Sequence, residues 1–372
     1  LLGPGDCAAQ FAEPDAGAPA PAWEDPATNA MNREEARATL RSYASRERAR
    51  AGDPDASSRV LSLNGPWSFA YAPRAAEAPD AFYEGPLDAS EWGTIPVPAN
   101  WELEGYGTPI YINIRYPFSP VAPPRVPEAG NAVGSYRRTF TLPEGWTDRQ
   151  VTLHFGGVSA AFLVWVNGEK VGYSEDSRLP AEFDVTPHLR AGENTVAVQV
   201  LRWSDGSYLE DQDHWRLSGL HREVYLEARP RAHVADLAVR TDLDAQYEDA
   251  ELQLRPELAN HTGGALDGWR VTAQLYDPDA QAVFTEPLSV PAQAITQERY
   301  PQRGTVDFPL LSATVEAPPT VPASPAFSSP CSMHPHRSSS SKAASLSTTT
   351  SRWDTSSSSG MSSVTGNARP TS

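Results

Sequence analysis

The chain has 372 residues, of which 40% are hydrophobic and 21% charged, and its net charge at pH 7 is -17. This length allows about two or three domains. The acidic balance argues against a nucleic acid or an anionic membrane as a partner, because both would repel the chain. The only cysteines, Cys7 and Cys331, cannot build a disulfide framework or a structural zinc site, so a cytoplasmic location is expected. No apolar run approaches the roughly 20 residues of a membrane span.

Residues 1–59 are interpreted as an N-terminal arm that is partly disordered. Residues 1–22 consist mainly of Ala, Pro, Gly and Asp, a composition that cannot bury a core. The first residue is Leu rather than Met, which leaves the true start open. The segment NREEARATLRSYASRER (32–48) is expected to form a short helix, with Asn32 as its N-cap and acids in its first turn. Its thin apolar content suggests that the arm packs on something else, such as another subunit.

From Leu61 onward the apolar residues alternate with a period of two, which predicts strands. In ENTVAVQVLRW (193–203) the alternation places three valines on one face. FLVWVNGEKVGY (162–173) predicts a hairpin, because Asn167-Gly168 suits a type I′ turn between two apolar strands. The predicted strands are separated by turn-forming Gly, Pro and Asn residues, and no helix pattern lies between them. Residues 60–227 are therefore predicted to be an all-β jelly roll or β-sandwich.

A second β pattern follows over residues 228–318. LAVRTDL (237–243), ELQLRPELAN (251–260) and WRVTAQLYD (269–277) alternate in the same way. TVDFPLLSATVEAP (305–318) is expected to supply a later strand. This region is predicted to be a smaller, incomplete immunoglobulin-like β-sandwich.

Residues 319–372 are rich in Ser, Thr and Pro, show no strand periodicity, and contain one acid, Asp354. They are either a natural low-complexity tail or the product of translation out of frame. The frame error is the favoured interpretation, because a sandwich cut in mid-fold exposes sheet edges. His334, His336 and Cys331 are not expected to hold a metal in such a tail.

The stretch QVLRWSDGSYLEDQDHWR (199–216) ends a predicted strand in a dense group of acids and aromatics. Asp205-Gly206 alone is typical of a turn. Carboxylates beside Trp203, Tyr208 and Trp215 also suit a sugar site, because carboxylates bind hydroxyls and aromatic faces cover the apolar face of a sugar. An oxygen-rich cluster can instead bind a hard cation.

LRWSDGSYLEDQDHWRLSGLHREVYL (201–226) resembles the end of the N-terminal sugar-binding jelly roll of bacterial β-galactosidases, which are glycoside hydrolases of family 2. Three further stretches agree in order: LNGPWSF (63–69), IPVPANWELEGYGTPIYINIRYPF (95–118) and FLVWVNGEKVGYSEDSRLPAEFDVTPHLRAGEN (162–194). WEDPATNAMNREEA is similar to the family's N-terminal arm. The resemblance runs from about Trp23 to Pro318.

The resemblance assigns two residues to a galactose site. The family's aspartate in WSDGS contacts galactose hydroxyls and helps to bind a sodium ion, and it corresponds to Asp205. The family's asparagine in YINIRYP corresponds to Asn113. The remaining loop residues are expected to build the loop through ion pairs and hydrogen bonds; they are Arg202, Glu210, Asp211, Asp213 and Arg216. No magnesium ligand is carried over, because the arm departs from the family's pattern.

The resemblance implies catalysis by retention, with two carboxyl groups about 5–5.5 Å apart on a (β/α)₈ barrel that follows the second sandwich. This chain has no Asn-Glu dipeptide, which carries the family's acid/base, and no alternating β-α pattern. Glu102, Glu175 and Glu210 lie in plausible loops, but no catalytic residue is assigned. The chain is therefore expected to be an N-terminal fragment, inactive alone, of a homotetrameric enzyme that cleaves terminal β-galactosides such as lactose and uses sodium and magnesium.

Three alternatives remain at this point. The chain could be a non-catalytic carbohydrate-binding module, a fragment of a related β-glucuronidase or β-mannosidase, or a structural element for assembly that takes no ligand.

Overall fold

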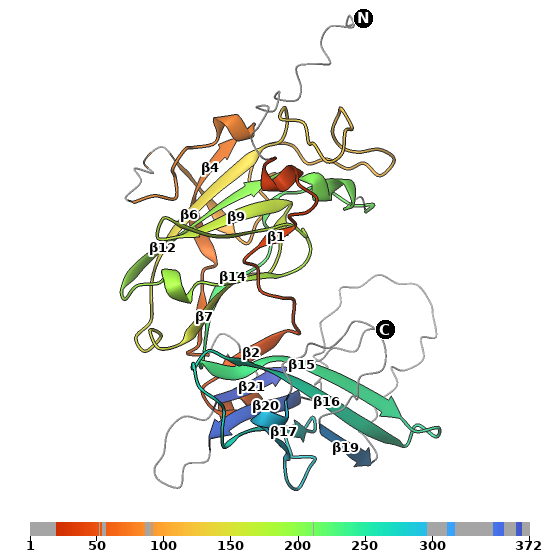
Figure 1. Ribbon diagram of the computed structural model, residues 1–372. Helices are drawn as coiled ribbons and strands as arrows, with labels where there is room; N and C mark the ends of the chain where they lie inside the picture. Colours follow the sequence, from red (N-terminus) through yellow and green to blue (C-terminus); the bar gives the residue numbers. More distant parts are fainter. Residues whose placement is uncertain are drawn as a thin grey trace, which may run out of the picture. The chain divides into compact units, whose positions relative to one another are not determined.

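The computed structural model describes residues 20–51, 53, 57–85, 90, 92–210, 212–295 and 311–316, and the backbone of 345–352 and 362–366. The described elements are nearly all strands, which confirms the predicted all-β class. The chain forms two compact units (Figure 1): unit 1 comprises residues 1–36 and 61–228, and unit 2 comprises 37–60 and 229–372. The arm is thus divided between the two units at residue 36.

Unit 1 contains two antiparallel sheets and a short ribbon. The first sheet has the order β1-β10-β9-β12-β6-β4-β5. Its strands are β1 (Ala30–Met31), β4 (Gly65–Ala72), β5 (Gly93–Val97), β6 (Val133–Thr141), β9 (Ala161–Val166), β10 (Glu169–Ser174) and β12 (Glu193–Leu201). The second sheet has the order β11-β7-β14-β3. Its strands are β3 (Val60–Ser62), β7 (Gln150–Phe155), β11 (Ala181–Asp184) and β14 (Val224–Arg229).

The core of unit 1 draws on both sheets, as expected of a sandwich. Trp67 and Phe69 of β4 are each 1% exposed, and the three valines of β12 are fully buried. These residues of β4 and β12 belong to one apolar cluster with residues of β7 and β14 from the second sheet. The predicted hairpin is confirmed between β9 and β10: Asn167 and Gly168 have φ of 52° and 90°, as a type I′ turn requires.

Short elements close the ends of unit 1. The strands β8 (Val158–Ser159) and β13 (Gly219–Leu220) pair as a ribbon. Four 3₁₀ helices complete the described part of the unit: η1 (Ala22–Glu24), η2 (Ala75–Glu77), η3 (Thr186–His188) and η4 (Asp205–Tyr208). The helix η4 directly follows β12, so that the largest sheet delivers its side chains to one end of the sandwich.

Unit 2 also contains two antiparallel sheets, with the orders β15-β16-β19 and β18-β17-β20-β21-β2. The strands are β2 (Leu40–Tyr43), β15 (Ala232–Leu243), β16 (Asp249–Asn260), β17 (Trp269–Tyr276), β18 (Leu288–Pro291), β19 (Leu311–Glu316), β20 (Ser345–Arg352) and β21 (Ser362–Gly366). The helices are α1 (Arg46–Ala51) and η5 (Ala292–Ala294). The predicted strands of this region are confirmed at β15, β16, β17 and β19.

The predicted helix over residues 32–48 is wrong. Asn32 has φ of 54°, outside the helical region, and its side chain donates to the carbonyl of Val171 at 2.9 Å. The chain forms β1 before this point and β2 after it, and helix appears only in α1. Backbone pairing of β2 with β21, together with the bridge between Arg33 and Phe183, thus overrides the helix propensity of the segment.

The tail contributes two strands that its sequence did not predict. The backbone of β20 pairs with β17 and β21, and β21 pairs with β2. Repeated threonines in β20 favour extended backbone even without apolar alternation. The rest of residues 319–372, with Cys331, His334 and His336, lies outside the described residues, as do residues 1–19.

Candidate functional site

The site is built on η4, where the strand β12 ends and the chain turns. The backbone N–H of Ser204 donates to the Ser207 hydroxyl at 3.0 Å, and Ser204 caps the helix in return. The side chain of Asn131 holds Trp203, the residue before Ser204, through two hydrogen bonds. The N–H of Trp203 donates to Asn131 Oδ1 at 2.9 Å, and Asn131 Nδ2 donates to the Trp203 carbonyl at 3.1 Å. The turn that Asp205-Gly206 predicted is therefore present and rigidly held.

Asp205 is the first residue of η4 and is only 9% exposed. Its Oδ1 accepts a hydrogen bond from the N–H of Gly206 at 2.8 Å. Its carboxyl group also shares a hydrogen bond with the carboxyl group of Glu175. Gly206 makes this approach possible, because a Cβ at this position would lie 2.7 Å from Glu175 Oε2. The backbone of η4 thus delivers one buried carboxylate beside a second.

Glu175 follows β10 and is the most perturbed carboxyl group of the site. Burial raises its pKa to about 8; the hydrogen bond and charge of Asp205 and the charge of Glu210 add to the increase, and the Tyr173 hydroxyl that donates to Glu175 opposes it. At neutral pH this carboxyl group is therefore mainly protonated. A protonated carboxyl can donate to a neighbouring carboxylate, which accounts for the close pair.

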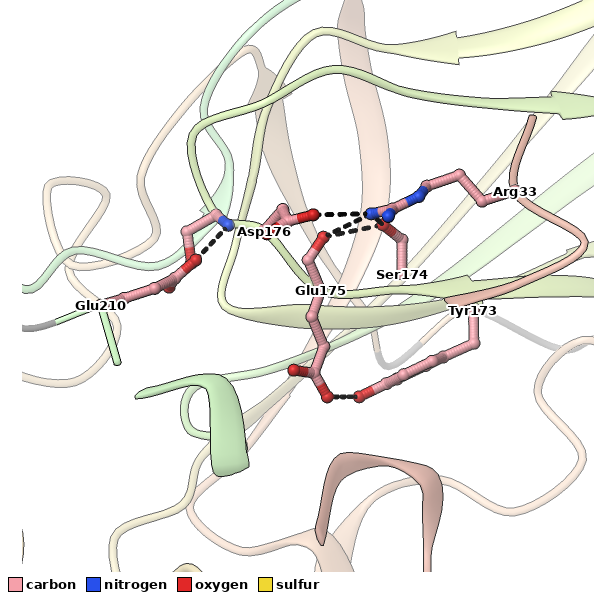
Figure 2. A network of polar contacts seen from close by, with 7 residues as sticks. Arg33, Tyr173, Ser174, Glu175, Asp176 and Glu210 are labelled. Carbon is pink, nitrogen blue, oxygen red and sulfur yellow. Dashed lines mark hydrogen bonds and ion pairs between the residues drawn. The ribbon is translucent and has the colours of Figure 1, made fainter. Parts of the chain in front are cut away.

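The arm fixes the segment that carries Glu175, as Figure 2 shows. Arg33 Nη1 donates to Ser174 Oγ at 2.9 Å and to the Glu175 carbonyl at 3.2 Å, and it pairs with Asp176 at 3.0 Å. The N–H of Glu175 donates to the carbonyl of Asn29 at 3.1 Å. This arrangement could not be predicted from the sequence, because Arg33 and its partners are 141 to 143 positions apart and meet through the pairing of β1 with β10.

Aromatic residues near η4 divide into buried and exposed groups. Trp203 and Tyr208 are buried against Tyr116, Phe118 and Val126, so they support the loop and offer no open face to a sugar. Trp215, in contrast, is 54% exposed.

Asn113 is exposed on the loop that follows Ile110. This loop is tied to the η4 loop, because the N–H of Arg216 donates to the Ile110 carbonyl at 2.8 Å. The Tyr111 hydroxyl donates to Asp213 at 2.7 Å, and the Tyr111 ring lies 5.5 Å from that of Trp215. Both predicted sugar ligands thus belong to one connected group of loops, although the structure gives no direct contact between Asn113 and Asp205.

The charged residues around η4 mainly hold the loops. Glu210 Oε1 accepts from the N–H of Ser177 at 2.7 Å, and its other oxygen accepts from the Ser177 hydroxyl. Arg216 Nη1 donates to the Glu210 carbonyl at 2.6 Å. Arg202 donates to the Thr108 carbonyl at 2.7 Å. Asp211 lies outside the described residues.

Within the described part of the chain, no group of three or more His, Cys, Asp or Glu side chains could hold a metal ion. Asp205 with Glu175 falls short of the oxygen cluster that a hard cation takes. The described residues also include no helix long and apolar enough to cross a membrane.

The sequence of residues 60–230 matches the family described as "Glycosyl hydrolases family 2, sugar binding domain". Residues 60–230 therefore belong to glycoside hydrolase family 2 as its sugar-binding domain, as the resemblance implied. A β-galactosidase of Priestia megaterium (strain DSM 319) is 44% identical over 272 residues, and one of Yersinia pestis (strain Angola) is 43% identical over 277 residues. These alignments cover 72% and 73% of this chain but 26% of each relative, so the chain spans about a quarter of their length.

Solved structures show the same fold at lower identity. A β-glycosidase from Bacteroides vulgatus aligns with a TM-score of 0.53 and 19% identity, over 79% of this chain and 32% of its own. A β-glucuronidase from Bacteroides uniformis aligns with a TM-score of 0.54 and 20% identity, over 79% and 30%. At this identity the likeness supports the β-sandwich fold and carries no information on substrate.

Proposed function

We propose that this chain supplies one wall of a binding site for a terminal β-D-galactose, as the sugar-binding part of a β-galactosidase. The observation that carries the proposal is Asp205: a buried carboxylate, fixed on η4, in a family 2 sugar-binding domain. The identity of 43–44% to β-galactosidases favours galactose over glucuronic acid or mannose. The structural similarity to a β-glucuronidase, at 20% sequence identity, does not favour glucuronic acid as the substrate.

Asp205 and Asn113 would hold sugar hydroxyls from two loops. The Asp205 carboxylate accepts hydrogen bonds, and the Asn113 amide both donates and accepts. An epimer whose hydroxyl points away leaves the buried Asp205 carboxylate unpaired, which gives the site its selectivity. Asp205 would also provide one sodium ligand, and the other ligands would have to come from outside the described residues. Nothing in the described part of the chain fits a magnesium site.

We propose further that this chain does not hydrolyse galactosides alone. A retaining glycosidase holds its two carboxyl groups about 5–5.5 Å apart, with the sugar between them. Glu175 and Asp205 instead share a hydrogen bond, which leaves no room for a sugar carbon between them. In the proposed function both residues bind and position, and a longer protein of the family would supply the nucleophile and the acid/base.

Calorimetry of the purified chain with galactose tests the binding proposal. We expect a Kd on the order of millimolar, and no binding of glucose, the epimer at one hydroxyl. The variants Asp205→Asn and Asn113→Ala should each weaken galactose binding about tenfold or more, whereas Asn260→Ala on unit 2 should not. Equal binding of glucose, or unchanged binding by both variants, would contradict the proposed site.

The same protein should show no turnover of a chromogenic galactoside. Turnover that disappears in Asp205→Asn would show that the chain is catalytic alone. A Kd well below millimolar would instead favour a self-sufficient carbohydrate-binding module. The absence of any sugar binding by a folded chain would favour a purely structural role.

A further inference from the structure

The strand β15 of unit 2 lies at one end of the sheet β15-β16-β19 (Figure 1). Among the described strands β16 is its only partner, so its other edge pairs with no described strand. β15 has 12 residues, twice the length of β19 at the opposite end of the sheet. Its β-bulge lies between Val234 and Asp236, and the register from there to Leu243 is regular.

The other end strands of the described sheets are short or contain proline. The strands β1, β2, β3, β8, β11 and β13 have two to four residues each. β5 contains Pro96, and β18 ends at Pro291. β15 has neither proline nor lysine. Because short strands, proline and lysine are the usual means of blocking an open sheet edge, an edge that lacks all three can template a further strand.

Apolar side chains accompany this open edge in the second half of β15. Val239 pairs with Leu254 of β16, and Leu243 pairs with Ala250, so both lie on the face of the sheet that carries the fully buried Leu254. Val239 is nevertheless 38% exposed and Leu243 49% exposed. The core side of the sheet is therefore open to solvent at this end of the strand.

The backbone groups of the same residues point toward the open edge. The N–H of Asp244 donates to the carbonyl of Asp249 at 3.0 Å, so Asp244 bonds toward the β16 side. In an antiparallel pair the residues that bond to one neighbour alternate along the strand. The N–H and C=O groups of Val239, Thr241 and Leu243 consequently point away from β16.

The segment VRTDL (239–243) is complementary to itself when two copies run antiparallel around Thr241. Val239 then lies opposite Leu243 of the second copy on one face, and Arg240 lies opposite Asp242 of the second copy on the other. Such apolar and opposite-charge cross-strand pairs are favourable. Centring the pairing on Arg240 or on Asp242 would instead place two like charges opposite each other, so the register around Thr241 is selected.

From this geometry we propose that β15 pairs with β15 of a second copy of this chain, antiparallel around Thr241. The contact uses the same surface on both copies, so it closes as a twofold symmetric dimer. Val239, Thr241 and Leu243 of each copy exchange backbone hydrogen bonds with the other, and the three-stranded sheets of the two copies join into one. The exposed Val239 and Leu243 side chains become buried against each other, which adds hydrophobic stabilisation.

Sedimentation velocity of the purified chain, at concentrations from about 1 to 500 μM, tests the proposal. We expect an equilibrium of monomer and dimer with a Kd on the order of 10–100 μM, because a single short strand pair is a small interface. Thr241→Pro removes the central N–H at an edge position that tolerates proline, and should weaken dimerisation about tenfold or more. Thr241→Val keeps this N–H and should dimerise like the unchanged chain.

Charge reversal tests the register. Arg240→Asp and Asp242→Arg each place like charges opposite each other twice in the symmetric contact, and each should weaken dimerisation about fivefold or more. An equal mixture of these two variants should associate again, because each copy then presents opposite charges to the other. Asp279→Arg is the matched control, since Asp279 is an exposed acid in the turn after β17 and the change in charge is the same.

The proposal is overturned if the chain stays monomeric over the whole range, or if folded Thr241→Pro dimerises as well as the unchanged chain. It is also overturned if the mixed charge variants associate no better than each one alone, or if Asp279→Arg causes an equal loss. Circular dichroism checks that each variant is folded, and the mixing experiment decides if Thr241→Pro is not. The assay contains no galactose, so its result is independent of the proposed sugar site.

Discussion

The two units share an antiparallel β architecture and differ in what their buried residues do. Unit 1 has a core rich in aromatic rings, among them Trp67, Trp101 and Tyr136, whereas the core of unit 2 is aliphatic, with Leu237, Leu254 and other leucines and valines. Glu175 and His221, two groups with clearly shifted pKa values, belong to unit 1.

This difference indicates where the chemistry lies. Groups with perturbed pKa values cluster at functional sites, because burial and neighbouring charges are the means of tuning them. In unit 1 Glu175, directly after β10, has such a pKa and lies beside Asp205 of the proposed sugar site. The described part of unit 2 has a packed apolar core and no comparable group of buried acids.

The largest expected effect comes from truncating each core. Trp67→Ala should destabilise unit 1 by about 3–5 kcal/mol, because it leaves a cavity and removes the Nε1–H hydrogen bond to the Leu63 carbonyl at 2.7 Å. Leu254→Ala should destabilise unit 2 by about 2–5 kcal/mol. Urea unfolding followed by tryptophan fluorescence reports mainly on unit 1, which holds most of the tryptophans. If both variants shift a single transition equally, the two units unfold as one and the comparison fails.

The second effect concerns Glu175. Its folded pKa of about 8 lies above the unfolded value near 4.5, so the folded chain binds the extra proton between these values. Stability is therefore highest below about pH 4.5 and is lost as pH rises toward 8. Glu175→Gln keeps the neutral form at every pH and should be more stable than the unchanged chain by about 2–3 kcal/mol at pH 9, after allowance for solvent screening.

Urea unfolding of both proteins in potassium buffers from pH 5 to 9 measures this effect. The exposed carboxyl of Glu193 provides the control, and Glu193→Gln should leave the profile unchanged. Parallel profiles for Glu175→Gln and the unchanged chain would show that Glu175 is not buried in the folded protein.

A smaller effect of opposite sign is expected at His221. Its folded pKa of about 4 lies below the unfolded value near 6.5, so the unfolded chain binds more protons between these values. Stability from this residue is present above about pH 6.5 and is lost as pH falls to 4. His221→Gln should recover about 1–2 kcal/mol at pH 4.5, measured against pH 7.5. His188→Gln, at an imidazole paired with Glu169 at 2.7 Å, provides a comparison on the surface.

The smallest effect concerns the arm. Arg33→Gln removes the donor to Ser174, Glu175 and Asp176, and should destabilise unit 1 by about 1 kcal/mol, because Asp176 is 47% exposed and the ion pair is screened. Limited proteolysis should detect earlier release of the arm, and galactose binding should weaken with it. An Arg33→Gln chain whose arm is as well protected as before would show that β1 pairing alone holds the segment.

The sequence predicted those parts of the structure that depend on neighbouring residues. Alternation along β12 and β17 determined which faces are buried, and Asn167-Gly168 determined the β9–β10 turn. The turn at Asp205-Gly206 followed from residue types alone. The prediction of a helix over residues 32–48 failed because helix propensity is a weak signal there. Pairing of β2 with β21 and the bridge between Arg33 and Phe183 supply backbone partners that an isolated segment lacks.

The sequence by itself therefore determined an all-β chain, a galactosidase-like loop after β12, and the position of Asp205 in that loop. Only the tertiary structure decided what surrounds Asp205. Glu175 lies 30 positions away and Arg33 is still more distant in sequence, and both reach the site because the register of β1, β10 and β12 brings their loops to one end of the sheet. The same register gathers Arg178, Arg202 and Arg216 around one pocket. Periodicity in the sequence indicates whether a side chain is buried, whereas strand pairing decides which buried or charged groups come into contact. The pKa values and the binding chemistry depend on those contacts.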